Sequence, residues 1–243
     1  MRTRRWFLSG ALALPLAALT LPGCGSGSGG GADERTFNFD FNEGIQGWTH
    51  GFADYPVGND ANFEFVFDAS ISLPESVDAN RRGVRIGGAN RSDDLFMFLK
   101  RKVEGLDPNR TYRVRFEVAL ASNERNGTPG AGGSPAQAVT VKAGATRGEP
   151  ARIEVEEAGR GVWRMNIDKG NQGMGGRDAL VLGDIGVDTG GAYLPKELTS
   201  GPTAFTVRAD SNGAAWLIVG TDSGYEGTTI LYYTGIKAVF TPL

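Results

Sequence analysis

The fold is decided by the stretch Thr111-Tyr-Arg-Val-Arg-Phe-Glu-Val118, in which apolar and charged residues alternate without a break. A period of two places the apolar side chains on one face of a β-strand and the charged side chains on the other. The apolar positions are Tyr112, Val114, Phe116 and Val118. One buried and one solvated face are typical of an antiparallel sheet. We therefore expect an all-β protein.

Similar apolar patterns occur on both sides of this stretch. Further strands are predicted at 36–41, 62–68, 95–103, 138–143, 152–156, 162–167, 179–182, 204–208, 215–220 and 230–241. Asn212-Gly213 is typical of a tight hairpin turn and predicts that 204–208 pairs with 215–220. The polar, glycine-rich segments 124–135 and 168–178, together with 188–202, are predicted loops. About ten short strands joined by turns predict an antiparallel β-sandwich of jelly-roll type, formed by one domain over residues 36–243.

Residues 1–23 have the features of a signal peptide. Arg2, Arg4 and Arg5 precede an apolar run at 6–21, which is shorter than the ~20 residues that a membrane-spanning helix needs. Thr3-Arg-Arg-Trp-Phe-Leu8 fits the twin-arginine export motif, an address read by a receptor. A general secretion signal that carries two arginines is the alternative.

Leu21-Pro-Gly-Cys24 is similar to a bacterial lipobox, in which the cysteine is acylated and becomes the new N-terminus. Cys24 is the only cysteine, so it cannot form an internal disulfide; it is either modified or an exposed thiol. Its position after an apolar run favours modification, for example by palmitate. Each buried methylene contributes ~0.8 kcal/mol to membrane binding. Residues 24–35 then form a lipidated, Gly/Ser-rich tether, and we expect a cell-envelope lipoprotein on the periplasmic or cell-surface side.

The charge of the chain excludes one class of partner. The three arginines of residues 1–23 leave 22 of the 25 basic residues against 28 acidic ones, so the mature chain carries a net charge of −6. Nucleic-acid binding needs a basic patch or stripe. We expect no nucleic-acid partner.

Three groups of residues resemble the carbohydrate-binding-module jelly rolls, which are related to galactose-binding-like domains. These are Phe39-Asp-Phe-Asn-Glu-Gly-Ile-Gln-Gly-Trp48, the turn and strand at 105–116, and the last strands at 215–240. The resemblance lies in core and turn residues, so it implies the fold better than the function. It implies a non-catalytic domain that binds glycan or another polar ligand.

The same resemblance raises a structural calcium ion as the one cofactor to consider. Many of these modules use an acid after the first strand and an Asp at the start of the last strand. Glu43 is the candidate for the first ligand, but the last strand, Tyr232-Tyr-Thr-Gly-Ile236, has no acid at the matching place. Calcium needs six to eight oxygen ligands. The sequence therefore leaves a calcium site open.

The sequence shows no catalytic motif. His50 is the only histidine, and neither a Ser–His–Asp spacing nor a phosphate loop is present. The acid pairs Asp93-Asp94 and Glu156-Glu157 are adjacent, and adjacent strand residues point to opposite faces. Neither pair alone can place two carboxyl groups across a glycosidic bond. We expect a protein that is not an enzyme.

A ligand site is predicted where the turn at 48–55 meets the segments 171–178 and 222–226. These segments combine aromatic rings with hydrogen-bonding groups, the mixture that polar-ligand pockets use. The candidates are Trp48, Asp54, Tyr55, Asn171, Gln172, Arg177, Asp178, Asp222, Tyr225 and Glu226. Packing under loops is the alternative for the aromatic residues. The alternative function is a structural or assembly lipoprotein that uses the sandwich for contacts with other envelope proteins.

Overall fold

The computed structural model describes residues 33–201 and 205–243. The predicted signal peptide, Cys24, the tether up to residue 32 and residue 204 lie outside the described residues. The described residues form one compact unit. None of the described helices is long and apolar enough to cross a bilayer.

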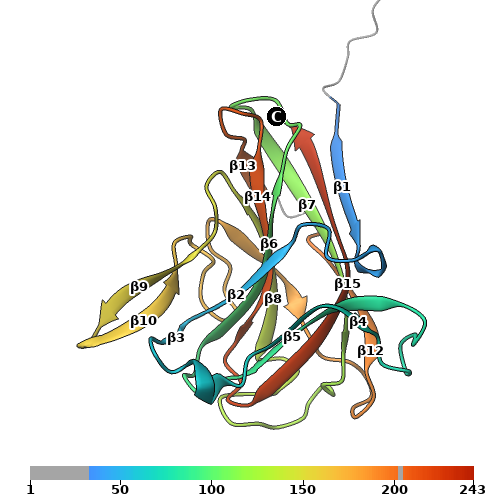
Figure 1. Ribbon diagram of the computed structural model, residues 1–243, viewed down its shortest axis with the longest axis vertical. Coiled ribbons are helices and arrows are strands. Elements are labelled where there is room, and N and C mark those ends of the chain that lie inside the picture. Colours follow the sequence, from blue (N-terminus) through green and yellow to red (C-terminus); the bar gives the residue numbers. More distant parts are fainter. Residues whose placement is uncertain (1–32, 202–204) are drawn as a thin grey trace, which may run out of the picture. The chain divides into compact units, whose positions relative to one another are not determined.

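The larger sheet has seven strands (Figure 1). Its order is β12 (Leu194–Thr199), β7 (Thr111–Ser122), β15 (Thr228–Pro242), β5 (Arg82–Ala89) and β4 (Val66–Ser72), with β1 (Arg35–Asp40) also paired to β15 and β13 (Phe205–Arg208) also paired to β7. The alternating stretch 111–118 is the first part of β7. Its predicted apolar residues are buried and its charged ones exposed. The central pair of the sheet is β7 with β15.

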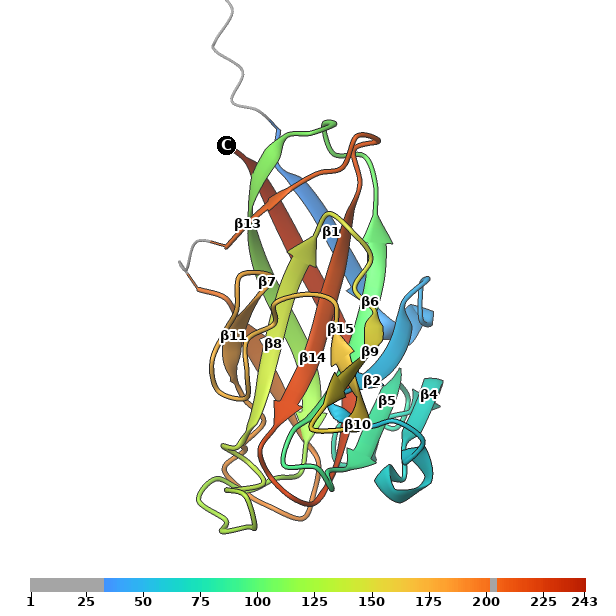
Figure 2. The same ribbon diagram turned by 90° about the vertical axis from the view of Figure 1, so that its left-hand side faces the viewer.

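The second sheet packs against the first to form a sandwich (Figure 2). Its five strands are β11 (Ala179–Asp184), β8 (Val139–Thr146), β14 (Ala215–Ser223), β6 (Leu95–Val103) and β2 (Thr49–Ala53), in that order. Aromatic rings close one side of the sandwich, where the edge strands β2 and β4 face each other. His50 stacks on Phe67 at 3.6 Å and Phe52 stacks on Phe65 at 4.0 Å between ring centroids.

A small third sheet covers part of the outer face of the five-stranded sheet. It consists of β3 (Tyr55–Pro56), β10 (Arg160–Met165) and β9 (Arg152–Glu157), and β9 and β10 project as an arm in Figure 1. Met165 packs with Phe96, Phe98 and Ile218 in a second apolar cluster. Part of the outer face of β6 and β14 is thereby covered, and a polar residue on it, Asp222, is fully buried.

The prediction of an antiparallel β-sandwich is confirmed, although the described residues form fifteen strands rather than about ten. The predicted hairpin is wrong. Strand β13 pairs with β7 in one sheet, whereas β14 pairs with β6 and β8 in the other. The Asn212-Gly213 turn exists, but it connects the two sheets. A local turn signal fixes a reversal of the chain and does not fix the partner of the next strand.

Other boundaries also differ from the prediction. The Phe63, Phe65 and Phe67 alternation is not one strand: Asp60–Phe63 is a short 3-10 helix, η2, and β4 begins at Val66. The predicted loop 188–202 contains β12, and β2 lies in the predicted turn 48–55. Strand β5 was not predicted, because its three glycines break the apolar alternation. The remaining short helix is η1 (Phe41–Glu43).

Candidate functional site

Three aspartates converge at one end of the five-stranded sheet. Asp54 follows β2, Asp94 precedes β6, and Asp222 lies in β14. These strands are neighbours, and Ala53 and Asp222 both lie opposite Phe96 in the register. One carboxylate oxygen of each aspartate lies within 4.8 Å of those of the other two. The Asp54 and Asp222 side chains are 3% and 0% exposed, so the charges are held away from water.

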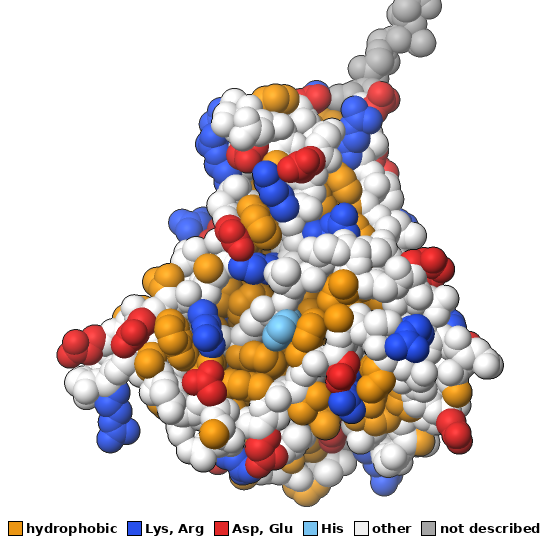
Figure 3. Space-filling view, viewed as in Figure 1, with side chains coloured by type: hydrophobic (Ala, Val, Ile, Leu, Met, Phe, Trp, Pro, Cys, Tyr) orange, Lys and Arg blue, Asp and Glu red, His pale blue; other side chains and the backbone are white. Residues whose placement is uncertain are grey.

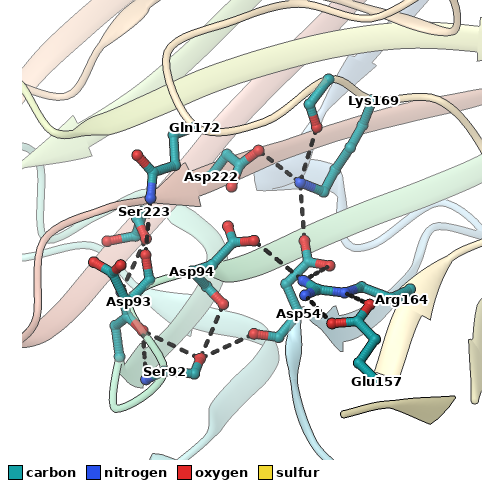
Figure 4. A network of polar contacts seen from close by, with 12 residues as sticks. Asp54, Ser92, Asp93, Asp94, Glu157, Arg164, Lys169, Gln172, Asp222 and Ser223 are labelled. Atoms are coloured by element: carbon teal, nitrogen blue, oxygen red, sulfur yellow. Dashed lines mark hydrogen bonds and ion pairs between the residues drawn. The ribbon is translucent and has the colours of Figure 1, made fainter. Parts of the chain in front are cut away.

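Two lysine ammonium groups lie among these carboxylates. Lys169 Nζ, from the loop after β10, lies 2.7 Å from Asp222 Oδ2, and it forms an ion pair with Asp54 Oδ2 at 2.8 Å (Figure 4). Lys142 Nζ, from β8, donates to the same Asp222 oxygen at 2.7 Å and to the Lys169 carbonyl at 3.1 Å. Both lysines are buried. A single carboxylate oxygen of Asp222 therefore accepts from two cations.

Arg164 of β10 links the arm to this cluster. Its Nη1 donates to Asp54 Oδ1 at 3.0 Å and to Asp94 Oδ2 at 3.2 Å. Its Nε and Nη2 each donate to Glu157 at 2.8 Å, which is the two-pronged geometry that makes arginine–carboxylate pairs strong. These hydrogen bonds to Glu157, followed by those to Asp54, raise the pKa of Arg164 although burial lowers it.

Burial and neighbouring charges shift the other groups in different directions. Burial, reinforced by the charges of Asp54 and Asp222, raises the pKa of Asp94 to about 7. Burial lowers the pKa of Lys142 more than Asp222 raises it. Burial also acts to lower the pKa of Lys169, but the charges of Asp222 and Asp54 outweigh it, so the net direction is upward. The pKa of Asp94 therefore lies near neutral pH, and the pKa of Lys142 lies below the ordinary value of a lysine.

The backbone holds the aspartates in place. Asp54 has a left-handed φ of 64°, which aspartate tolerates better than most residues, and its amide donates to the Trp163 carbonyl at 2.6 Å. The Ser92 hydroxyl donates to the carbonyl of Asp54 at 2.9 Å or to that of Asp94 at 3.0 Å. The two loops that carry these acids are thus tied together.

A pocket of about 470 Å³ opens beside the cluster. Its lining combines charged and amide groups with apolar side chains: Asp54, Asp94, Arg164, Asp168, Lys169 and Asn171 with Met165, Ile167 and Met174. The loop 166–178 forms one wall. Asp178 Oδ2 accepts from the Asp168 amide at 2.8 Å, and Asp168 accepts from the amides of Gly170 and Arg177 at 3.1 Å each. The loop is therefore closed by its own hydrogen bonds.

Gly144 on the outer face of β8 lets this loop approach the sheet. A Cβ atom at position 144 would lie 2.0 Å from the Asp178 carbonyl oxygen, far inside contact distance. The same loop carries Lys169. A side chain at position 144 would push this loop away from the sheet and would move the Lys169 ammonium group with it.

Several predicted site residues come together. Asp54 and Asp222 are joined through Lys169, and Asn171 lines the pocket. Gln172 donates to the Asp93 carbonyl at 2.9 Å and fastens the loop to the start of β6. Asp178 serves the internal closure of the loop. Arg177 has an 80% exposed side chain, pairs with its neighbour Asp178 and does not line the pocket.

Two of the aromatic residues predicted for the ligand site, Trp48 and Tyr55, are buried instead. Trp48 is 3% exposed and packs edge-on against Phe39 and Phe41. Tyr55 is fully buried, and its hydroxyl group contacts Asp60 and Arg152. Neither ring offers a face to a ligand, because both rings belong to the hydrophobic core of the sandwich.

Tyr225 and Glu226 lie in the turn between β14 and β15 and do not line the pocket. The Tyr225 ring is half-buried, and Cβ atoms at Gly130 and Gly227 would lie 2.7 and 2.3 Å from it, so these glycines pack on the ring. Glu226 is exposed, and its amide donates to the Ala131 carbonyl at 2.9 Å. Among the described residues, no aromatic side chain belongs to the exposed large hydrophobics.

The sequence analysis missed the cationic half of the cluster. Lys142 is the only charged residue in the otherwise uncharged strand 139–146, a signal that could have marked it as a buried, paired group. Arg164, between Trp163 and Met165, carries a similar signal, whereas Lys169 carries none because it lies in a polar, glycine-rich loop. Their partners are distant in the chain: Asp54 is 110 residues from Arg164.

The calcium ligand considered from the resemblance does not fit. Glu43 is exposed and does not belong to a group of acids close enough to hold an ion. The acid group found among the described residues is Asp54, Asp94 and Asp222, where Lys169 and Lys142 already bring positive charge to the carboxylates. Glu43 is therefore not part of the acid group found among the described residues.

Comparisons with known proteins were made at three levels. No protein-family model and no curated protein sequence matches the chain. A carbohydrate-binding module from a study of specific mannan recognition, TmCBM27, matches with a TM-score of 0.38 and 10% identity, over 86% of this chain and 98% of that one. TmCBM61, solved with β-1,4-galactotriose, matches at 0.36 and 10%, over 82% and 92%.

A putative sugar-binding protein from Bacteroides thetaiotaomicron matches at 0.36 and 9% identity, over 78% and 86% of the two chains. The enzymatically active domain of bacteriophage CBA120 tailspike protein 4 matches at 0.33 and 10%, over 82% of this chain, which spans 20% of that protein. At such values the similarity says nothing about what this chain binds.

Proposed function

We propose that this chain is an exported, lipid-anchored, non-catalytic binding protein for a small hydroxyl-bearing ligand such as a glycan. The observation that carries the proposal is the pocket beside the Asp54–Asp94–Asp222 cluster, in which fixed donors, fixed acceptors and apolar side chains share one lining. Carboxylates accept hydrogen bonds from hydroxyl groups, and guanidinium and ammonium groups donate to them. Apolar lining with a few placed polar groups is the composition of ligand pockets.

The polar groups of this pocket are organised before a ligand arrives. Arg164 is held by Glu157, Asp54 and Asp94, and Lys169 is held by Asp54 and Asp222. A ligand that adds hydrogen bonds to such groups does not have to order them, which favours affinity. Met174, with an exposed side chain at the rim, supplies an apolar surface for the C–H face of a sugar ring.

The same contacts favour binding over hydrolysis. Glycoside hydrolysis needs the scissile glycosidic bond between two carboxyl groups. Asp54 and Asp94 would be the candidates, since Asp94 has a raised pKa. Arg164 Nη1 donates to both of them, so a guanidinium group already lies between these two acids. The two acids therefore serve as fixed acceptors in the proposed site.

The test is a glycan array with the soluble domain from Ala32 onward, followed by calorimetric titration of the best ligand. Replacing two exposed lining residues, Asn171→Ala and Met174→Ser, should weaken binding about tenfold each, or about 1.4 kcal/mol. Arg177→Ala is the matched control, because Arg177 lies on the same loop outside the pocket. Equal effects of all three variants, or binding to no glycan, would count against the proposal.

Lipid anchoring has its own test. Radiolabelled palmitate should be incorporated into the wild-type chain and not into Cys24→Ala, because Cys24 is the only cysteine that can carry it. Equal labelling of both chains would overturn the anchor.

The exposed large hydrophobic side chains of the described residues come from different segments and do not by themselves favour a protein-contact role. They are Ile153, Met174, Val181 and Leu243.

A further inference from the structure

We propose that Lys142 and Asp222 become joined by an intramolecular isopeptide bond, with the Asp94 carboxyl group as the proton carrier. This bond goes beyond the binding function and does not depend on it. The proposal stands on the geometry of the buried Lys142 and Asp222 side chains and the partly buried Asp94, at the end of the five-stranded sheet where the charged cluster lies (Figure 4 shows Asp94 and Asp222).

The two reacting residues lie on adjacent strands and on the same face. In the register of β8 with β14, Lys142 pairs with Gly220 and Asp222 pairs with Thr140, so the two side chains are diagonal neighbours. Lys142 Nζ lies 2.7 Å from Asp222 Oδ2, and the side chains are 1% and 0% exposed. The amine and carboxyl groups are therefore in contact, and the exclusion of water disfavours hydrolysis of the amide bond once it has formed.

The protonation states suit an attack by the amine. An ion pair can transfer one proton from the ammonium to the carboxylate, which gives a neutral amine and a neutral acid. Burial lowers the pKa of Lys142, which favours this transfer. Burial and the neighbouring acids raise the pKa of Asp94 to about 7, so a large share of Asp94 keeps its proton at neutral pH. Oδ1 of Asp94 and Oδ1 of Asp222 are buried without a hydrogen-bond donor. A proton on Asp94 would supply a donor at this place.

The reaction balances with no further reagent. Lys142 Nζ attacks Asp222 Cγ, and a tetrahedral intermediate forms. Asp94 takes one proton from the nitrogen and gives its own proton to one hydroxyl of the intermediate. The Cγ–O bond then breaks, water leaves, and a Cγ–Nζ amide bond remains. No atom is oxidised or reduced, and Asp94 ends in the state in which it began.

Lys142 is the nucleophile, while Lys169 serves as the electrostatic partner. Lys169 is held by Asp54 as well as by Asp222 and also donates to the Gly170 carbonyl. Its charge is retained, since the pKa of Lys169 is raised. A fixed ammonium group beside Asp222 Oδ2 stabilises the negative charge that develops on the carboxyl oxygen during the attack.

The product relieves an unfavourable arrangement. A buried ion pair loses its hydration and regains only part of that energy from the attraction between the charges. An amide bond replaces two buried charges by a neutral group, and its carbonyl oxygen still accepts from Lys169. The bond then joins β8 covalently to β14, the central strand in the order of the five-stranded sheet.

The experiment is peptide mapping of the full-length chain by mass spectrometry after denaturation and trypsin digestion. Trypsin cleaves after Lys and Arg, so the cross-link predicts that peptide 126–147, uncleaved at Lys142, is attached to peptide 209–237. The joined species should weigh about 18 Da less than the sum of its parts, because one water is lost. The exposed pair of Lys237 with Glu117, at 3.0 Å across β15 and β7, is an internal control that should stay unlinked.

Two variants assign the roles. Lys142→Arg keeps the charge but removes the amine and should abolish the link. Asp94→Asn keeps the shape and both reacting residues, and should slow link formation about 100-fold, the range of general acid–base catalysis. Circular dichroism of each variant verifies the fold. Complete recovery of free peptides 126–142 and 209–237 from the wild type would overturn the proposal, and a link through Lys169 would overturn the choice of nucleophile.

Discussion

Asp54→Asn is the substitution that best tests whether the charged cluster supports the fold. The change keeps the volume of the side chain, and asparagine accepts the left-handed φ of 64° at this position, so the backbone gains no strain. It removes the charge that faces Arg164 at 3.0 Å and Lys169 at 2.8 Å. The result is a buried, partly uncompensated positive charge.

The expected loss of unfolding free energy depends on the ion pairs that Lys169 and Arg164 keep in Asp54→Asn. Removing one partner of a buried ion pair costs about 3–5 kcal/mol. Lys169 keeps Asp222, and Arg164 keeps Glu157 and Asp94, so the loss should lie at the lower end, about 3 kcal/mol. With a urea m-value of about 2 kcal/mol/M, the midpoint of unfolding should fall by roughly 1.5 M.

Glu117→Gln is the matched control for this measurement. It makes the same acid-to-amide change in the pair with Lys237, whose acid is 55% exposed. Exposed ion pairs contribute about 0–1 kcal/mol, so the urea midpoint should move by less than about 0.5 M. If both variants lost the same stability, the idea that the cluster acts as a buried support would be refuted.

Two further predictions concern the same region. The pKa of Asp94 is raised from 3.8 to about 7 in the folded chain, so the wild type should lose stability as pH rises from about 4 to 7, by up to about 1.4 kcal/mol per pH unit relative to Asp94→Asn. Urea midpoints across this range check the sign, and parallel profiles of the two chains would contradict it. Gly144→Ala should lower stability by about 1–3 kcal/mol and weaken ligand binding, because its Cβ would meet the Asp178 carbonyl at 2.0 Å. Gly148→Ala, which would meet nothing within 4 Å, should be neutral in thermal unfolding, and an equal loss would exclude the steric explanation.

The sequence determined the class of fold, because that class depends on local alternation. The period of two in 111–118 fixes which side chains of β7 face the core, whatever its partners are. The sequence also named Asp54 and Asp222 as hydrogen-bonding groups of one predicted ligand site. The glycine-rich, polar composition of 168–178 was enough to predict a loop.

Only the tertiary structure decided the pairing of the strands and the membership of the charged cluster. The Asn212-Gly213 turn gives the reversal, but β14 lies between β6 and β8, which pair with both of its hydrogen-bonding edges. Lys142, Lys169 and Arg164 reach the aspartates across separations that run from 53 residues (Lys169 to Asp222) to 115 residues (Lys169 to Asp54). Charge pairing at such separations leaves no periodic trace in the sequence, since it depends on which strands become neighbours. Phe39 and Phe41, which cover Trp48, are near it in the sequence, but only the folded chain shows that the rings turn toward it.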